Sequence, residues 1–460
     1  MPALTAGIWR WIRKVILLVS LNGFDPKRPP TEAPKRPPLV SGWAHHHMIC
    51  HYASAGASEP MANFNLHRVL AEAPRGNDFL SVLDVPGRQE QELRDARDLI
   101  RETIRAGFSS WQRTVDRRAL LQEVALKRAV PDPKLKPKFR MQGSASYHTL
   151  NLPARQPPQR IDYDDGLYLP VSFLAETGSP VLASAGFFRL VEALLAPLCE
   201  RKGWQLRQKP SCVRVQLSNR AHIDLPLYAI PDNEFETLLE KAAVANSAMD
   251  RALVRDGMAF DESIYEALPI DDIRLAHRDR GWIKSDPRLI ERWFKDAIAT
   301  HGYQLRRVCR YFKAWRDHHW DACVLSSIAI MKCVVDAFDE VHWSLDPKRD
   351  DLAALEVAAR LSTYFAGKIA NPVVDGALDD NWSEVDRRAF IAKAKELHTQ
   401  ISSAIRGTDS AAVALSELTQ AFGPRIPQDV TLVVVTAEAT VRSFQPTKVP
   451  ARQVPKTTSG

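Results

Sequence analysis

The chain has 460 residues, of which 45% are hydrophobic and 25% charged. This is the composition of an ordinary globular protein with room for about two to four domains. The formal net charge of +7 sits at the two ends, with +4 in residues 1–60 and +3 in residues 444–460, so that residues 61–443 sum to zero. A neutral body lacks the broad basic footprint of a duplex-binding protein, so we expect no stable complex with duplex nucleic acid.

The first 60 residues read as an irregular N-terminal extension. They are rich in proline, and Met61-Ala-Asn-Phe-Asn has the character of a natural start, so residues 1–60 need not belong to the native protein. The apolar run Val15–Leu21 is too short to cross a bilayer, and we do not expect a membrane protein. The six cysteines form no CxxC pair, which favours reduced thiols and a cytoplasmic location.

Two helical segments are predicted next. Residues 89–108 carry Leu93, Ala96, Ile100 and Ile104 on one stripe, with charges elsewhere. A second, polar segment covers about 110–129, before three prolines break the chain. Further on, residues 183–200 form an apolar helix.

The segment from Gln142 to Leu169 predicts a site for phosphate and metal. In the strand predicted over 162–169, Asp162 and Asp164 project to the same side. Two neighbouring carboxylates disfavour each other's ionisation, and a divalent metal removes that cost. Upstream, Gly143 allows close approach of a ligand and Ser144 adds a hydroxyl, at the start of a short predicted helix whose first amides face phosphate.

A β-hairpin is predicted after the apolar helix. Its strands are Cys212–Leu217 and Ala221–Ile230, with a turn at Ser218-Asn219. The second strand carries Asp224 among apolar residues. On spacing alone this acid is an edge or turn residue about as often as a metal ligand.

The acidic motif has competing interpretations. The motif does not fit a calcium-binding EF-hand loop, because Leu167 occupies its sixth position, where glycine is required, and Phe173 its twelfth, where glutamate is required. A surface turn at Asp164-Asp165-Gly166 is the plain alternative. The upstream Gly-Ser and the later strand with Asp224 favour a two-metal nucleotidyltransferase site. Asp162 and Asp164 would hold a metal at the triphosphate, and Asp224 would join them at a second metal that activates a ribose hydroxyl, or receive its proton.

From about residue 250 the chain is predicted to be mostly helical. Ser285-Asp286-Pro287 supplies a helix start. In the following helix one apolar face is predicted to point inward: Leu305, Val308, Phe312 and Trp315. Arg306, Arg310 and Lys313 share another face, a pattern more typical of a solvated surface, although Lys313 could reach a triphosphate. Residues 444–460, rich in Pro, Thr and Lys, are typical of a flexible tail.

Several ordered motifs resemble the bacterial cGAS/DncV-like nucleotidyltransferases (CD-NTases). They are Gly-Ser, Asp-x-Asp-Asp-Gly-x-Tyr-x-Pro and His-Ile-Asp-x-Pro-x-Tyr-Ala-Ile-Pro, followed by Trp282-Ile-Lys-Ser-Asp-Pro, Lys313-Ala-Trp-Arg-Asp and Ala421-Phe-Gly-Pro-Arg. The resemblance covers about 61–430 and the final residues, and matches 340–415 only loosely.

The resemblance implies an α+β fold, with a polymerase-β-like core and a mixed or antiparallel sheet, packed against a mostly helical lobe with the active site in the cleft. The implied division is an extension over 1–60, a core with N-terminal helices over 61–250, a helical lobe over 251–430 and a flexible tail over 431–460. By position, Asp162, Asp164 and Asp224 match the catalytic, metal-binding acids. The matching nucleotide-binding positions are Gln142, Gly143, Ser144, Tyr147, Arg214, Ser285, Lys313 and Ser327.

The activity implied by the resemblance is synthesis of a second messenger. Two Mg²⁺ ions would assist the joining of ATP and GTP into 3′,3′-cyclic GMP-AMP, which activates an effector such as a phospholipase in anti-phage defence (CBASS). Some members of the family are joined to targets through a C-terminal glycine by an E1–E2-like partner, which points to Gly460. The rival functions are a nucleotidyltransferase with another cyclic di- or trinucleotide or a linear product, an inactive nucleotide sensor, and an interaction protein that works through its tail.

Overall fold

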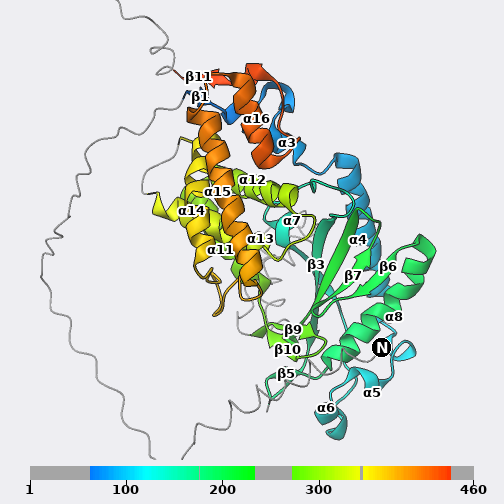
Figure 1. Cartoon of the computed structure of the whole chain (residues 1–460). Helices are drawn as coiled ribbons and strands as arrows, with labels where there is room; N and C mark the ends of the chain where they lie inside the picture. Colours follow the sequence, from blue (N-terminus) through cyan, green and yellow to red (C-terminus); the bar gives the residue numbers. More distant parts are fainter. Residues whose placement is uncertain (1–62, 176, 234–271, 342–345, 437–460) are drawn as a thin grey trace, which may run out of the picture. The chain divides into compact units, whose positions relative to one another are not determined.

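A computed structural model describes residues 63–175, 177–233, 272–341 and 346–436, and everything below concerns these residues. They form a twisted sheet flanked by helices and a separate group of helices (Figure 1). The predictions for residues 1–60 and for Gly460 lie outside the described residues.

The central sheet is mixed, as predicted. Its order is β10-β9-β8-β3-β2, and β7 with its partner β6 also joins β8. β3 and β8 pair in parallel, and the other pairs are antiparallel. The strands are β2 (Lys138–Gln142), β3 (Ile161–Val171), β6 (Gln205–Gln208), β7 (Cys212–Gln216), β8 (Ala221–Pro231), β9 (Arg274–His277) and β10 (Gly281–Lys284). The predicted hairpin is confirmed as β7–β8.

The two faces of the sheet differ in chemistry because side chains alternate along each strand. The odd-numbered residues of β3 and β8 are mostly apolar and pack under helices α4 (Gly87–Phe108) and α8 (Ser184–Lys202), which lie along the sheet in Figure 1. Both helices were predicted, and the stripe Leu93–Ile104 on α4 is buried as expected. The even-numbered residues make the opposite, polar face, called here the catalytic face.

Asp165 shows why the Asp-Asp-Gly sequence is not a turn. It lies inside β3, its side chain is fully buried on the apolar face, and it accepts hydrogen bonds from the guanidinium of Arg101 on α4. Breaking such a pair would leave a bare buried charge, so the pair anchors α4 to the sheet. The surface-turn interpretation was therefore wrong.

The helix predicted over 110–129 is broken into short pieces: η2 (Trp111–Arg113), α5 (Arg117–Leu120) and α6 (Glu123–Lys127). The cause is tertiary. At Leu121 the backbone becomes extended and bridges to Leu182, and Gln122 N–H donates to the carbonyl of Val181. The neighbouring strands β4 (Phe173–Leu174) and β5 (Ser179–Pro180) form a small ribbon of their own.

The second group of helices forms the helical lobe. Its elements are α11 (Pro287–His301), α12 (Tyr303–His319), α13 (Ser327–Glu340), α14 (Asp350–Ala366), α15 (Glu384–Arg406), α16 (Ala411–Phe422) and η5 (Val430–Leu432). Asp286 caps α11 by accepting from the backbone N–H of Arg288, and Pro287 follows, as predicted. The predicted inward face of α12 is fully buried. The range 251–430 also contains β9 and β10, which instead extend the core sheet.

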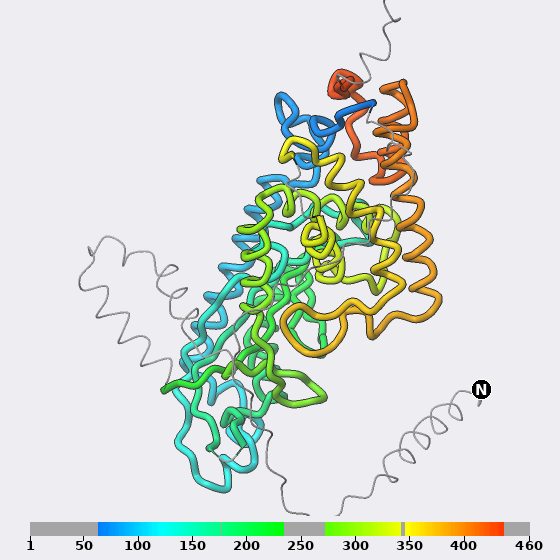
Figure 2. Tube along the Cα trace, turned by 90° about the vertical axis from the view of Figure 1, so that its left-hand side faces the viewer, coloured from blue at the N-terminus to red at the C-terminus, as the bar shows by residue number. Residues whose placement is uncertain are grey.

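The first described residues pack on the helical lobe, although the predicted division assigned them to the core. β1 (Phe64–Asn65) pairs with β11 (Val434–Val435), so the two ends of the described chain meet (Figure 2). The elements that follow are α2 (His67–Leu70), η1 (Pro74–Gly76) and α3 (Phe79–Val82). The buried side chains of α2 and α3 join the lobe's hydrophobic core. The range 431–460, predicted as a tail, thus begins with η5 and β11.

A buried charged network joins this N-terminal segment to the lobe. Asp350, fully buried at the start of α14, accepts from the guanidinium of Arg307 (2.7 Å) and the hydroxyl of Tyr311 (2.8 Å). His67 Nδ1 lies 3.5 Å from its carboxylate. Burial alone would raise the pKa of Asp350, but the bonds from Arg307 and His67 lower it to about 2. The network therefore stabilises the fold above pH 3.8, and that stability is lost as the pH falls towards 2.

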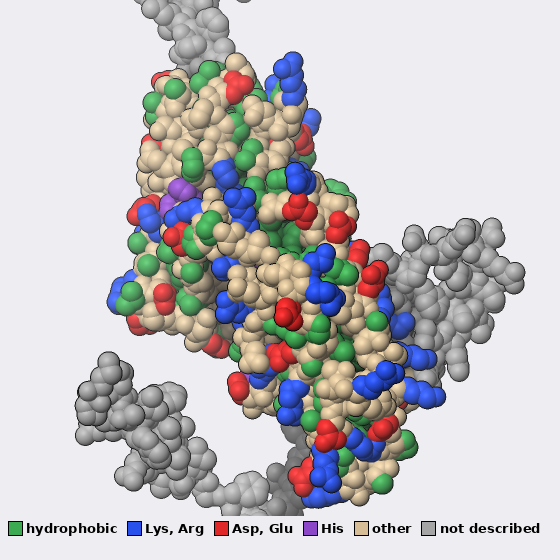
Figure 3. Space-filling view, turned by 90° about the vertical axis from the view of Figure 1, so that its right-hand side faces the viewer, with side chains coloured by type: hydrophobic (Ala, Val, Ile, Leu, Met, Phe, Trp, Pro, Cys, Tyr) green, Lys and Arg blue, Asp and Glu red, His purple; other side chains and the backbone are tan. Residues whose placement is uncertain are grey.

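No helix among the described residues is long and apolar enough to span a membrane. The cysteines that the structure describes are free thiols: Cys199, Cys212, Cys309, Cys323 and Cys333. On the face shown in Figure 3, Lys and Arg side chains lie among Asp and Glu side chains.

We predict that Asp350→Ala lowers the free energy of unfolding by about 3–5 kcal/mol, because it leaves the charge of Arg307 buried without its partner. Asp339→Ala removes an exposed acid, paired with His301 at 2.6 Å, and should cost at most about 1 kcal/mol. Denaturant unfolding of both variants measures the difference. Equal losses would contradict the assignment of Asp350 as a buried anchor.

Candidate functional site

Three carboxylates meet on the catalytic face because of the register between two parallel strands. Asp164 on β3 pairs directly with Asp224 on β8, and Asp162 pairs with His222. Residues two apart on a strand share a face, so all four side chains point the same way. Asp224 lies on an interior strand and is only 7% exposed, which excludes the edge or turn alternative.

The three acids differ in what holds them. The guanidinium of Arg214 on β7 donates to both oxygens of Asp224, each at 2.6 Å. The imidazole of His222 lies with Nε2 2.7 Å from Oδ1 of Asp162. Arg214 itself comes only to within 4.0 Å of Asp162. Asp162 and Asp224 therefore each have one strong partner, and Asp164 is the neighbour of both, two residues from Asp162 on β3 and paired with Asp224 across the strands.

The neighbouring charges shift the pKa values of Asp164 and Asp162 in opposite directions. Burial and the carboxylates of Asp162 and Asp224 raise the pKa of Asp164 well above its usual range. For Asp162 desolvation acts in the same direction, but the hydrogen bond with His222 and the cation of Arg214 outweigh it and lower the pKa. A carboxyl whose ionisation is disfavoured by neighbouring anions is one that a cation would stabilise.

The donors on this face fit a divalent cation. Asp162, His222 and Asp224 each present one ligand atom, and these atoms lie within 4.8 Å of one another. Asp164, the cross-strand partner of Asp224, adds a further carboxylate beside this group. Although Arg214 holds both oxygens of Asp224, an ionised carboxylate offers about four acceptor positions, so a cation can bind beside the arginine.

Gly143 is required at the edge of this site for two reasons. Its φ of +66° lies in the left-handed region, and a Cβ on it would meet Oδ2 of Asp164 at 2.1 Å. Gly143 begins the short helix α7 (Gly143–Ser146), so the Gly-Ser turn is pressed directly against the acids. The predicted short helix is confirmed.

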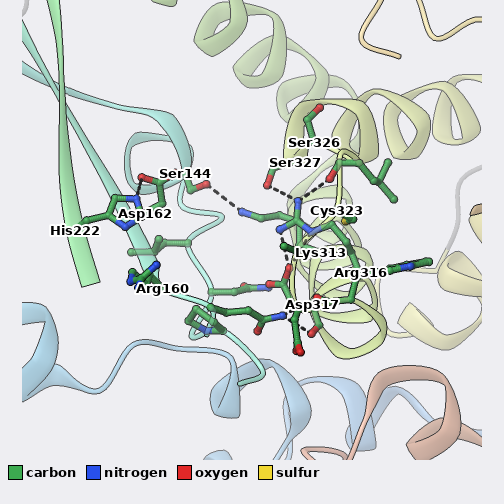
Figure 4. Close-up of a pocket in the computed structure, with 18 of the residues that line it drawn as sticks. Ser144, Arg160, Asp162, His222, Lys313, Arg316, Asp317, Cys323, Ser326 and Ser327 are labelled. Atoms are coloured by element: carbon green, nitrogen blue, oxygen red, sulfur yellow. Dashed lines mark hydrogen bonds and ion pairs between the residues drawn. The ribbon is translucent and has the colours of Figure 1, made fainter. Parts of the chain in front are cut away.

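Lys313 on α12 faces the Gly-Ser turn from the lobe. Its Nζ donates to Ser144 Oγ at 3.1 Å (Figure 4) and to the carbonyl of Thr149 at 2.6 Å. The residue is only 4% exposed. Burial, with the positive charges of Arg316 and Arg310, lowers the pKa of Lys313 to about 7. The basic side of α12 is thus turned towards the core rather than solvated.

Arg316, one turn further along α12, organises the start of α13. Its Nη1 donates to the carbonyl of Leu325 at 3.2 Å and to Ser327 Oγ at 3.0 Å. Ser326 caps α13 by accepting from the backbone N–H of Ala329. Ser327 is thereby held at the N-terminus of a 14-residue helix, which favours negative charge.

These walls enclose a pocket of about 380 Å³ that both the core and the helical lobe line. Of the predicted site residues, five line it: Ser144, Asp162, Arg214, Lys313 and Ser327. Gly143, Asp164 and Asp224 lie beside it, in contact with or paired to these residues.

Three predicted nucleotide contacts lie away from this pocket. Gln142 is held between two tyrosines further along the catalytic face, with Nε2 3.3 Å from the hydroxyl of Tyr228 and Oε1 3.5 Å from that of Tyr168. The Tyr147 ring packs towards Phe294, at 6.2 Å between centroids. Ser285 precedes the cap of α11 and is not among the lining residues.

The structure adds lining residues to which the sequence analysis gave no role: Arg160, His222, Arg316 and Asp317. A signal was present for three of them. Arg160 stands two residues before Asp162, and His222 two before Asp224, the spacing of one strand face. Arg316 stands three residues after Lys313, the spacing of one helix face.

A pocket beside acids on one face of a sheet, with a Gly-Ser turn and a lysine opposite, has the architecture of a nucleotidyltransferase site. Residues 137–228 match the family described as Cyclic GMP-AMP synthase DncV-like, nucleotidyltransferase domain. Residues 302–435 match the family described as Cyclic GMP-AMP synthase, C-terminal domain.

Individual relatives agree with these matches. The cyclic GMP-AMP synthase of Vibrio cholerae serotype O1 is 33% identical over 317 residues, covering 66% of this chain and 71% of the relative. That of Escherichia coli strain TW11681 is 32% identical over 338 residues, covering 70% and 76%. The solved structure of Vibrio cholerae DncV in complex with the linear intermediate 5′ pppA(3′,5′)pG has a TM-score of 0.66 at 26% identity, covering 82% of this chain and 99% of that one.

The chain belongs to the DncV-like cyclic GMP-AMP synthases, and it is a nucleotidyltransferase. The resemblance found in the sequence is confirmed, and so is the fold that it implied.

We predict that Gly143→Ala reduces nucleotidyl transfer by at least about 100-fold, because the new methyl group displaces Asp164. Gly203→Ala is the matched control: Gly203 has a nearly equal φ of +68°, but nothing lies within 4 Å of its added Cβ. It should lose about 1–2 kcal/mol of stability and keep its activity. Nucleotide incorporation and melting curves test both variants, and an active Gly143→Ala enzyme would refute the argument.

We predict that triphosphate affinity falls as the pH rises from 7.5 to 9. Lys313, with its pKa near 7, is neutral in the free pocket over this range, so binding an anion requires proton uptake, and Kd rises by up to about tenfold per pH unit. Lys313→Arg keeps its charge and should flatten the slope. Calorimetry with a non-hydrolysable ATP analogue measures it, and equal slopes in both proteins would contradict the prediction.

Proposed function

We propose that the enzyme joins ATP and GTP into 3′,3′-cyclic GMP-AMP in two successive transfers. The observation that carries the proposal is the juxtaposition, across one pocket, of Asp162 on the sheet with Ser144 and Lys313. The relatives are named cyclic GMP-AMP synthases, and a solved relative holds a linear adenine–guanine intermediate. An intermediate of that kind is what a two-step synthesis requires.

The residues divide the work by charge. The triphosphate of the donor nucleotide would contact the hydroxyl of Ser144, the ammonium group of Lys313 and the N-terminus of α13 at Ser327. Asp162, Asp164 and Asp224 would hold divalent cations, for which we propose two Mg²⁺ ions. Bound there, the cations neutralise triphosphate charge and lower the pKa of the attacking ribose hydroxyl. We propose that Asp224 also accepts the proton of that hydroxyl.

Arg214 is proposed to have two partners. In this structure its guanidinium forks onto Asp224. It also lines the pocket, so it can contact a bound nucleotide while restraining the acid. Gln142, Tyr147 and Ser285 stay proposed nucleotide contacts by position in the family, outside the pocket described above.

The biological role is proposed from the family resemblance. The product would act as a second messenger in anti-phage defence and activate an effector such as a phospholipase. Conjugation at Gly460 by an E1–E2-like partner stays a prediction.

We predict that the protein converts labelled ATP and GTP, with Mg²⁺, into a phosphatase-resistant product with 3′–5′ linkages. Chromatography after incubation with all four nucleoside triphosphates separates it from a cyclic trinucleotide, from another dinucleotide and from linear oligonucleotides. A linear or longer product would replace the proposed one. No product with any divalent metal, from folded protein, would favour an inactive sensor.

In the same assay, Asp162→Ala should abolish synthesis with little change in melting temperature, because its half-exposed side chain is not part of the core. The control is Asp321→Ala, which removes an acid from the opposite wall of the pocket, where it pairs with Arg155 at 2.7 Å. This variant should retain activity within several-fold. Synthesis by Asp162→Ala would refute the role of the acids.

A further inference from the structure

His222 is the one imidazole that the described chain places against the three acids. It precedes Asp224 by two residues on β8 and is the direct cross-strand neighbour of Asp162. Its Nε2 lies 2.7 Å from Oδ1 of Asp162, a full-strength hydrogen-bond distance. Because an ionised carboxylate can only accept, the imidazole is the donor through Nε2.

The two partners differ sharply in exposure. The side chain of Asp162 is 53% exposed, whereas that of His222 is 7% exposed. An exposed carboxylate on a short side chain would sample several orientations. A buried ring packed into the sheet is the restraint that prevents it.

The second ring nitrogen argues against a purely structural histidine. Nδ1 of His222 is buried and has no hydrogen-bond partner among the described residues. Buried polar atoms are nearly always paired, and an exception calls for a functional explanation. The ring thus makes a single hydrogen bond, and that bond goes to a catalytic acid.

We propose that His222 is a positioning residue and not itself a cation ligand: it orients Asp162 for cation binding by donating from Nε2, and a nitrogen that carries the donated proton has no lone pair left for a metal. The inference rests on the proposed function in that the cation serves nucleotidyl transfer at these acids. Hydrogen-bonding partners that orient metal ligands commonly change metal affinity or activity by about 10–100-fold when removed. His222 does this for Asp162, as Arg214 does for Asp224.

Two substitutions of similar size separate this role from a structural one. His222→Gln keeps an amide N–H near the position of Nε2, whereas His222→Asn places its amide near Nδ1, out of reach of Asp162. Titrating the full-length protein with Mn²⁺ alone, followed by electron paramagnetic resonance of the free ion, gives a Kd without nucleotide. We expect His222→Asn to weaken Mn²⁺ binding by about 10–100-fold and His222→Gln to stay within about threefold of wild type.

The kinetic readout is the dependence of synthesis on metal concentration. His222→Asn should require more metal and recover most of its kcat at saturation, with melting temperatures of both variants close to wild type. Equal Mn²⁺ affinity in all three proteins, equal losses in both variants, or no Mn²⁺ binding by the wild type would each overturn the proposal. If the Mn²⁺ pattern holds but no cyclic product forms, the proposed function fails and the role of His222 stands.

Discussion

The parallel pairing of β3 with β8 is the constraint on which the site depends. Its register sets Asp164 against Asp224 and Asp162 against His222, on one face of the sheet. Carboxylates at this spacing repel, and the protein offsets the repulsion by giving Asp224 an arginine and Asp162 an imidazole. A shift of one residue in either strand would turn the polar side chains of that strand, Asp162 and Asp164 on β3 or His222 and Asp224 on β8, into the apolar core on the other face.

The opposite wall of the pocket depends on a similar balance of burial and charge. α12 buries its apolar side in the lobe and turns Lys313 and Arg316 towards the core. Desolvation weakens the charge of the lysine in the free protein, and an incoming triphosphate would restore it. The pocket is therefore complementary to anions on one side and to cations on the other, which suits a metal–triphosphate complex.

The site joins two hydrophobic cores, and the chain ties them together at several places. Arg140 on β2 donates to the carboxylate of Glu291 on α11 at 3.2 Å, and the guanidinium of Arg310 on α12 donates to Oδ1 of Asn151 at 2.8 Å. Near the pocket, Gln159 donates to the carbonyls of Asp317 (2.6 Å) and Trp320 (2.8 Å) at the end of α12. Such contacts fix the distance between Lys313 and the acids, which a phosphoryl-type transfer requires.

The sequence by itself determined the elements with a local period: the strand with Asp162 and Asp164, the β7–β8 hairpin, α4, α8 and the inward face of α12. It also determined the family, because ordered motifs are specific. Only the tertiary structure decided which charges are buried. In the sequence, Arg310 and Lys313 have the spacing of a solvated helix face. Asp165 lies in a sequence typical of a turn, and residues 110–129 have the pattern of a helix. In each case a contact from a distant segment decided the outcome. Local periodicity shows which side chains share a face of a helix or strand. Tertiary packing decides what that face contacts, which here is an acid, an arginine or a strand far along the chain.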